Sequence, residues 1–259
     1  MGTPVSPTLA TQALGIRAGT RQLVSNLSAE FHGGELTAIL GRNGSGKSLT
    51  LHTLAGLRGV QQGAVRLADM PIDRLSRRAI ARHIGLLMQD LEESFVTTAL
   101  ESVLVGRHPH LGLWQWESAE DERLAQEALK RVNMDELAGR TTDGLSGGER
   151  RRLAIASLLA QAPDVYLLDE PTNHLDPQHQ IAVLELFRKL ADSGNTVIAT
   201  LHDPTLAARF ADRAILLFGD GRWSSGATRD VVTAASLSEL YLTPMIEITA
   251  AAHRAFVNA

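Results

Sequence analysis

Residues Gly41–Ser48 read GRNGSGKS and fit the pattern G-x-x-x-x-G-K-[ST]. Glycines at this spacing let the backbone turn so that several N–H groups point at the oxygens of a phosphate chain. A helix that begins at the end of the loop aims its positive end at the same anion. Lys47 is expected to reach the β- and γ-phosphates, and the hydroxyl of Ser48 to bind Mg²⁺. The sequence therefore predicts a binding site for a nucleoside triphosphate.

The segments around this loop alternate between strand and helix patterns. Residues 14–40 form short apolar runs broken by glycines and end in a buried strand, Leu36–Leu40, and a helix is expected over Ser48–Leu57. The pattern is helical from Thr97 to about Ala160, and the tail is expected to be helical after Ser236 and to lose its pattern beyond Pro244. Further strand-like runs lie at residues 84–88, 165–168, 197–201 and 214–218. This order predicts a parallel α/β core that carries a helical insert.

The composition narrows the classes of protein. The 259-residue chain is 44% hydrophobic and 21% charged, as in ordinary globular proteins, and its net charge of −4 gives no sequence-independent grip on nucleic acid. It has no cysteine, which excludes disulfides and cysteine-based zinc sites. No signal peptide is evident, and no uncharged apolar stretch approaches the ~20 residues that cross a bilayer. If the chain serves a membrane, we expect it to do so from the aqueous side and through a partner.

Two acidic residues end the apolar run Val165–Leu168. Asp169 and Glu170 stand at the expected tip of a buried strand. Beside a phosphate-binding loop, the first carboxylate would hold Mg²⁺ and the second would polarise the attacking water as a general base. An apolar run followed by an acidic residue is common at strand ends. The pair therefore indicates a catalytic site only because a phosphate loop lies upstream in the sequence.

Residues Leu145–Glu149 read LSGGE and resemble the signature sequence of the ABC ATPase family, usually written LSGGQ. A serine and glycines are also the residues of an ordinary helix N-cap, and taken in isolation the segment would be interpreted as such a cap. The position of the segment ahead of Asp169 favours the family. The resemblance extends over nearly the whole chain and implies a P-loop NTPase (RecA-like) core with an N-terminal antiparallel β subdomain and an inserted α-helical subdomain. We expect one ABC ATPase domain over residues 1–259, with the helical subdomain at 97–162.

Three further elements are similar to the family's motifs and follow in its order. Gln89 resembles the glutamine that senses the γ-phosphate and Mg²⁺, residues 173–176 resemble the D-loop, and His202 resembles the switch histidine that contacts the γ-phosphate. By this resemblance the catalytic residues are Glu170, His202 and Gln89, and the metal ligands are Ser48, Gln89 and Asp169. The expected nucleotide-binding residues are Gly41, Arg42, Asn43, Gly44, Ser45, Gly46, Lys47, Ser48, Thr50, Ser146, Gly147, Gly148, Glu149 and Asp176.

The chain departs from the family's pattern at two places. The family usually has an aromatic residue about 25 positions before the phosphate loop to stack on adenine, but residues 14–20 contain none, so we expect Ile16 or Arg17 to replace it. Glu149 stands where glutamine is common, and Arg150 follows it. The sequence therefore predicts how the phosphates are bound more firmly than how the adenine base is bound.

The resemblance implies ATP and Mg²⁺ as cofactors and a head-to-tail homodimer, in which Ser146, Gly147 and Gly148 serve the partner's nucleotide. It also implies two transmembrane permease subunits, and a periplasmic substrate-binding protein that acts through them. The expected location is the cytoplasmic face of the inner membrane, as a peripheral subunit. The contact with the permease is expected around Asp90–Gly106.

The stretch after Gln89 resembles one group within the family. Residues 106–110 read GRHPH, and the importers of iron-siderophores, haem and cobalamin often have GR-x-P-H here. Residues Pro177–Gln180 are similar to that group too. The expected cargo is cobalamin or a ferric siderophore, with haem as a third option.

A metal site at His108 and His110 is disfavoured, because the sequence has no carboxylate or cysteine beside them. The alternative function is a soluble ABC ATPase that acts on nucleic acid or ribosomes, but the chain has neither a long coiled-coil insert nor a second cassette.

Overall fold

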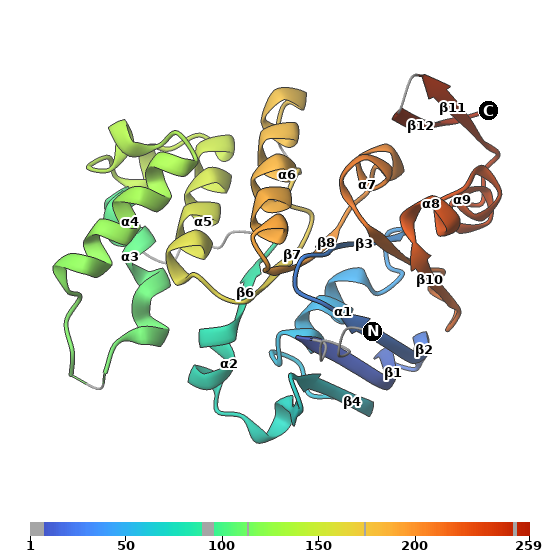
Figure 1. Ribbon diagram of the computed structural model, residues 1–259, viewed down its shortest axis with the longest axis horizontal. Coiled ribbons are helices and arrows are strands. Elements are labelled where there is room, and N and C mark those ends of the chain that lie inside the picture. The colour runs from blue at the N-terminus through green and yellow to red at the C-terminus, as the bar shows by residue number, and fades with distance from the viewer. Residues whose placement is uncertain (1–7, 90–95, 113, 174, 251–252) are drawn as a thin grey trace, which may run out of the picture.

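The computed structural model describes residues 8–89, 96–112, 114–173, 175–250 and 253–259. Its centre is a six-stranded sheet with the order β10-β9-β3-β8-β7-β6 (Figure 1). Five of these strands are parallel and β10 pairs antiparallel with β9. The strands are β3 (Leu36–Gly41), β6 (Ile84–Leu87), β7 (Val165–Leu168), β8 (Thr196–Thr200), β9 (Arg213–Leu217) and β10 (Trp223–Ala227).

An antiparallel sheet with the order β2-β1-β4-β5 covers one face of this centre together with helix α1. Its strands are β1 (Leu9–Ala18), β2 (Arg21–Phe31), β4 (Gln62–Leu67) and β5 (Met70–Pro71). Leu27 and Phe31 of β2 lie an even number of positions apart, and both pack inward on Leu51 and Leu54 of α1. Leu9 and Leu14 of β1 join them, because a register shift between Thr11 and Leu14 interrupts the alternation of this strand. The first strand therefore begins five residues before the β-rich segment that the sequence indicated.

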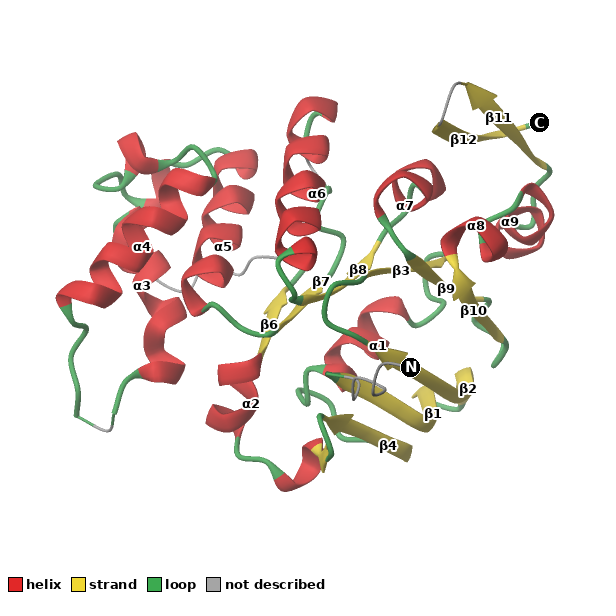
Figure 2. Cartoon of the chain, in the orientation of Figure 1, coloured by secondary structure: helices red, strands yellow, loops and turns green. Residues whose placement is uncertain are grey.

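Helices cover the other face of the central sheet (Figure 2). Figure 1 shows α3, α4 and α5 grouped at one end, and α6 and α7 standing beside them over the sheet. The helices are α1 (Lys47–Leu54), α2 (Arg77–His83), α3 (Ala99–Leu104), α4 (Ala119–Arg131), α5 (Gly147–Gln161), α6 (Pro177–Asp192), α7 (Pro204–Phe210), α8 (Thr228–Val231) and α9 (Ala234–Tyr241). Short 3-10 helices lie at Ile72–Arg74, Val105–His110, Asp135–Leu137 and Thr142–Gly144.

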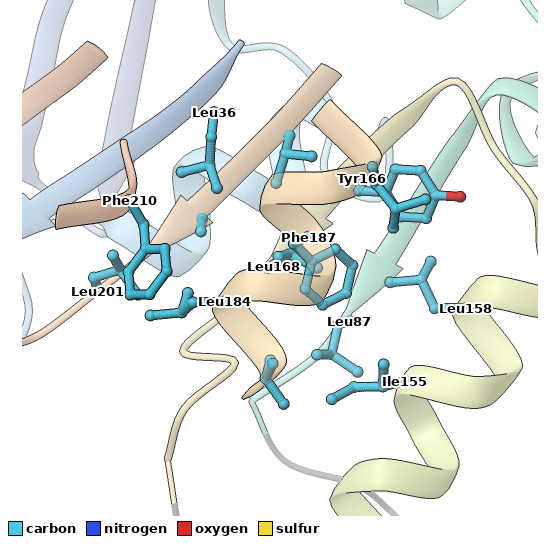
Figure 3. Close-up of a cluster of buried hydrophobic side chains, with 14 of the residues drawn as sticks. Leu36, Leu87, Ile155, Leu158, Tyr166, Leu168, Leu184, Phe187, Leu201 and Phe210 are labelled. Atoms are coloured by element: carbon cyan, nitrogen blue, oxygen red, sulfur yellow. The ribbon is translucent and has the colours of Figure 1, made fainter. Parts of the chain in front are cut away.

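The larger hydrophobic core lies between these helices and the sheet (Figure 3). Phe187 of α6 is fully buried and meets the edge of the Tyr166 ring, with ring centroids 5.9 Å apart. Leu168 and Leu87 come from neighbouring strands, and Ile155 reaches them from α5. Helix α5, which begins within the LSGGE segment, thus packs directly onto β6 and β7, the strands that precede Gln89 and Asp169.

Two expectations from the sequence need correction. Helix α1 ends at Leu54 rather than Leu57, because Gly56 takes a left-handed conformation with φ of 67° that turns the chain out of the helix. Beyond Pro244 the chain is not irregular: β11 (Met245–Ala250) and β12 (His253–Asn258) form an antiparallel hairpin. None of the helices in the described parts of the chain has the length and apolar character that a bilayer crossing needs.

Candidate functional site

The phosphate loop joins the end of β3 to the start of α1 and has the backbone geometry of an anion cradle. Gly44 and Gly46 have φ values of 75° and 103°, which L side chains rarely adopt. A Cβ on Gly41 would lie 2.4 Å from Ser45 Oγ and 2.6 Å from the Leu217 carbonyl, so the loop also lacks room for a side chain there. Ser45 Oγ is buried and has no hydrogen-bond partner among the described residues. An unsatisfied polar atom in a turn of this shape fits a phosphate oxygen.

Lys47 begins α1, and its side chain is almost completely buried in the loop. Its Nζ donates to the Gly41 carbonyl at 3.0 Å and lies 3.9 Å from Glu170 Oε1. Burial lowers the pKa of Lys47, while the Glu170 and Asp169 carboxylates oppose that shift. A buried cation held by one carbonyl and one carboxylate is ready to exchange these partners for phosphate oxygens.

The two acidic residues follow β7 at the same edge of the sheet as the phosphate loop, because the parallel strands β3, β8 and β7 end together. Asp169 is 1% exposed and Glu170 is 5% exposed. The intervening strand β8 ends in Thr200, whose Oγ1 donates to Asp169 Oδ1 at 2.7 Å and accepts from the Glu170 N–H at 2.8 Å. One hydroxyl therefore fixes both residues.

Glu170 joins the predicted catalytic groups to one another. Its Oε1 contacts His202 Nε2, next to the ion pair with Lys47, and its Oε2 accepts from the Asn173 amide. Glu170 has a φ of 48°, a left-handed conformation that is costly for a side chain of this size. Such backbone strain persists where the surroundings enforce it and is concentrated at functional sites.

Two further predicted site residues, Gln89 and Thr50, lie after β6 and in α1. Gln89 follows β6, and its exposed side chain lies next to residues 90–95, which are outside the described residues, as is His174 of the predicted D-loop. Thr50 is buried in α1, and its hydroxyl donates to the Gly46 carbonyl at 2.8 Å, so its side chain stabilises the loop from inside the helix.

The LSGGE segment is a helix cap as well as a candidate binding site. Ser146 is the N-cap of α5, where its Oγ accepts from the Glu149 N–H at 3.2 Å, and the Glu149 carboxylate accepts from the Ser146 N–H at 2.7 Å. This reciprocal pair lowers the pKa of Glu149, chiefly through the Ser146 backbone N–H. Glutamine can make the same bond, so the glutamate preserves the cap.

Asp176 has a capping role at α6. Its Oδ1 accepts from the His179 N–H at 3.0 Å, and the carboxylate bonds the His179 ring at 2.8 Å. These bonds lower the pKa of Asp176, first through the His179 backbone and then through its ring. Arg152 of α5 donates to the other ring nitrogen at 2.9 Å. The predicted D-loop is thereby tied to the helix that follows the signature.

Arg151 is a residue that the sequence did not single out. The residue is 4% exposed, and its guanidinium donates to the carbonyls of Asp169 and Glu170 at 2.8 Å each. The same group also donates to the carbonyls of Met88 and Gln89. It thus joins α5 to the ends of β6 and β7. The sequence gives no reason to single out one arginine in an arginine-rich chain, and only the burial of Arg151 in the structure distinguishes it from the others.

The GRHPH segment stabilises the far end of α5. Arg107 donates to the Ala160 carbonyl at 2.7 Å, and the His110 ring bonds the Gln161 carbonyl at 2.8 Å. Cations and donors at a helix C-terminus satisfy its unpaired carbonyls. The motif is therefore structural in this chain.

Two arguments from the sequence are wrong in part. His108 does have a carboxylate nearby, because Glu117 Oε1 lies 3.6 Å from its Nε2, although no group of three such ligands occurs among the described residues. Ile16 is 2% exposed and packs in the core between the sheets, so it cannot stack on a base. Arg17 is exposed and is the remaining candidate of the two.

Comparison with known proteins agrees with this geometry. A sequence profile of the ABC transporter family matches residues 24–173. The chain is 41% identical over 85% of its length to the hemin import ATP-binding protein HmuV of Hahella chejuensis and covers 87% of that protein. It is 39% identical over 86% of its length to the ferric enterobactin transport ATP-binding protein FepC of Escherichia coli, covering 83% of it. It is 40% identical over 83% of its length to the cobalamin import ATP-binding protein BtuD of Halobacterium salinarum, of which it spans only 54%.

Solved structures give the same result. A metal-chelate type ABC transporter in an inward-facing conformation matches with a TM-score of 0.85 and 30% identity, covering 97% of both chains. The dimeric ATP-binding cassette MJ0796 bound to ADP and Pi matches with a TM-score of 0.73 and 28% identity, covering 85% of this chain and 99% of that one. None of these comparisons supports the nucleic-acid alternative.

The chain belongs to the ABC transporter family, and it is an ATPase with the P-loop fold that the sequence predicted. Within the family it falls among the ATP-binding subunits of the siderophore, haem and cobalamin importers.

Proposed function

We propose that this chain powers an importer by hydrolysing ATP held between the phosphate loop and Glu170. The observation that carries the proposal is the buried contact of one carboxylate, Glu170, with both Lys47 and His202. Lys47 binds the β- and γ-phosphates and releases Glu170 when it does so. The freed carboxylate then accepts a proton from the water that attacks the γ-phosphorus. His202, beside the same carboxylate, contacts the γ-phosphate.

The residues near the loop also fit Mg²⁺. Oxygen donors are the ligands this ion prefers, and the candidates are the Ser48 hydroxyl, the Gln89 side chain and the Asp169 carboxylate. Mg²⁺ bound there would neutralise charge on the phosphates. The Thr200 hydroxyl donates to Asp169 Oδ1 at 2.7 Å and fixes the position of this carboxylate, whose other oxygen would be available to the ion.

A homodimer would complete the site. Gly147 is the first residue of α5, directly after the N-cap Ser146. Its φ is not left-handed, and a Cβ there would meet no described atom within 4 Å. Neither conformation nor packing within this chain requires the glycine. A requirement from outside, such as the nucleotide of a partner subunit approaching the helix N-terminus, accounts for it.

The relatives suggest the cargo and the partners. Their names specify hemin, ferric enterobactin and cobalamin. We propose that this chain serves two transmembrane permease subunits and a periplasmic substrate-binding protein, as a peripheral subunit on the cytoplasmic face of the inner membrane. The cargo is cobalamin or a ferric siderophore, with haem as a third option, and Mg²⁺ is the metal cofactor.

Reconstitution tests this function. The chain is purified with its permease, placed in proteoliposomes, and given labelled cobalamin, a ferric siderophore or haem. ATP-dependent uptake of one of these cargoes, lost with Lys47→Ala, is the expected result. Unchanged uptake with Lys47→Ala, or uptake of none of the three, would contradict the proposal.

A further inference from the structure

The end of the chain lies against the segment that carries His202. This C-terminal unit consists of helix α9 and the β11–β12 hairpin. Tyr241, the last residue of α9, donates from its hydroxyl to the His202 carbonyl at 3.3 Å. The backbone N–H of Phe256 in β12 donates to Thr205 Oγ1 at 3.1 Å. The switch segment, residues 201–205, runs from the end of β8 into the first turn of α7. It is therefore held at two points by one unit.

The unit is firmly attached to the rest of the molecule. Leu237 and Leu240 of α9 are buried in the larger core, and Phe256 of β12 is buried in the same cluster. The Met245 N–H donates to Ser238 Oγ at 2.9 Å, which fixes the hairpin on α9. Arg254 donates to the Val232 carbonyl at 2.6 Å and pairs with Glu247 at 2.6 Å. A unit anchored in this way can restrain the segment it touches.

The Tyr241 hydroxyl is a dependable donor. Burial, with a smaller contribution from Asp203, raises its pKa to about 12, so the phenol remains protonated at any pH at which the protein works. The acceptor is the backbone of His202 rather than its ring, which leaves the imidazole free to contact Glu170.

We infer that the C-terminal unit positions His202 for ATP hydrolysis, with Tyr241 and Thr205 as the positioning residues. This inference rests on the proposed roles of Glu170 and His202. The His202 side chain must stay in position while Glu170 loses its contact with Lys47 and forms one with the attacking water. A backbone held at the His202 carbonyl and at Thr205 preserves that place, whereas a loose segment would let the imidazole leave it.

The first test replaces Tyr241 by phenylalanine, which removes only the hydroxyl. We expect kcat for ATP hydrolysis by the purified full chain to fall about five-fold, the effect of losing one hydrogen bond in the transition state. The KM for ATP should stay within about two-fold, because the phosphate loop is untouched. Tyr166→Phe is the matched control, since Tyr166 is the chain's other tyrosine and is buried with its ring against Phe187. It should leave both constants unchanged.

The second test uses Thr205. Thr205→Val removes the acceptor for Phe256 at nearly the same volume and should lower kcat as Tyr241→Phe does, whereas Thr205→Ser keeps the hydroxyl and should retain activity. The inference is overturned if Tyr241→Phe and Thr205→Val both keep the wild-type kcat, or if Tyr166→Phe lowers kcat equally. His202→Ala in the same assay separates the two proposals: if it retains full turnover, the proposed role of His202 fails. If it loses turnover while Tyr241→Phe does not, only the positioning role fails.

Discussion

The guanidinium of Arg151 donates to the backbone carbonyl of Glu170 at 2.8 Å, across the space between helix α5 and the end of β7. Through its bond to Asp169 as well, it sets the direction of both acidic residues, and through Gln89 it reaches the end of β6. We expect a displacement of α5 to be transmitted through Arg151 to Asp169 and Glu170. Within one chain, Arg151 thus links the segment proposed to bind the partner's nucleotide to the acidic residues proposed to act on the chain's own nucleotide.

We predict that Arg151→Lys weakens both stability and turnover. An ammonium group can reach one of the two loops but cannot bridge them, so buried carbonyls lose their donors. The free energy of unfolding should fall by about 2–3 kcal/mol in urea titration, and kcat by at least ~10-fold. Arg123→Lys, on the exposed face of α4, is the control and should change neither. Wild-type turnover in Arg151→Lys would show that the link to Glu170 is dispensable.

Lys47→Ala should abolish ATP binding or hydrolysis. The side chain is the cation of the phosphate loop, and its removal also leaves Glu170 buried without that partner. Binding is measured by isothermal titration with ATP. Lys130→Ala is a suitable control, because the chain has only three lysines and this one lies on the surface of α4. An unaffected ATPase rate in Lys47→Ala would refute the role of the loop.

We predict that Asp121 makes a pH-dependent contribution to the stability of the fold. The Ser118 hydroxyl, the Arg107 guanidinium and the Ser118 N–H hold the pKa of Asp121 at about 2, below its usual 3.8. A carboxyl with a depressed folded-state pKa contributes stability above about pH 4 that is lost as the pH falls toward 2. The Tm of wild type should therefore exceed that of Asp121→Asn at pH 7, and the difference should shrink as the pH is lowered from 4 toward 2. A difference independent of pH would contradict this.

Gly147→Gln should block ATP-dependent dimerisation without unfolding the subunit. Open space surrounds Gly147, so the side chain fits within one chain but fills the position proposed for the partner's nucleotide. Gly139→Gln is the control, because Gly139 also has open space and no left-handed φ. Sedimentation with ATP should give monomers for the first variant and dimers for the second. Dimers in both would contradict the composite site.

The parts of the site that could be predicted from sequence are those fixed by local backbone chemistry. The left-handed turns at Gly44 and Gly46 require glycine, and Lys47 follows them at a set spacing, so the loop can be read directly. The acidic pair after β7 could be predicted only together with the phosphate loop, because an acidic residue after an apolar run is common at strand ends. The roles of these residues, and the division of the chain with a helical subdomain at 97–162, stay predictions.

The rest depends on contacts between distant segments. Arg151 reaches carbonyls 18 to 63 positions away, and no local pattern encodes such a bond. The C-terminal hairpin did have a local signal, because Ile246, Glu247, Ile248 and Thr249 alternate between apolar and polar residues as a strand does. The attachment of this hairpin to α7 through Phe256 and Thr205 is visible only in the fold.

Glu170→Gln tests the central claim, that this carboxylate drives hydrolysis of ATP held by the phosphate loop. The amide keeps the size of the side chain but cannot accept the proton of the attacking water. The measurement is single-turnover hydrolysis of radiolabelled ATP alongside ATP binding, with Glu127→Gln on the exposed face of α4 as the control. We predict that Glu170→Gln binds ATP and accumulates as a closed dimer while hydrolysis falls at least ~100-fold. Near-normal hydrolysis by Glu170→Gln would contradict the account.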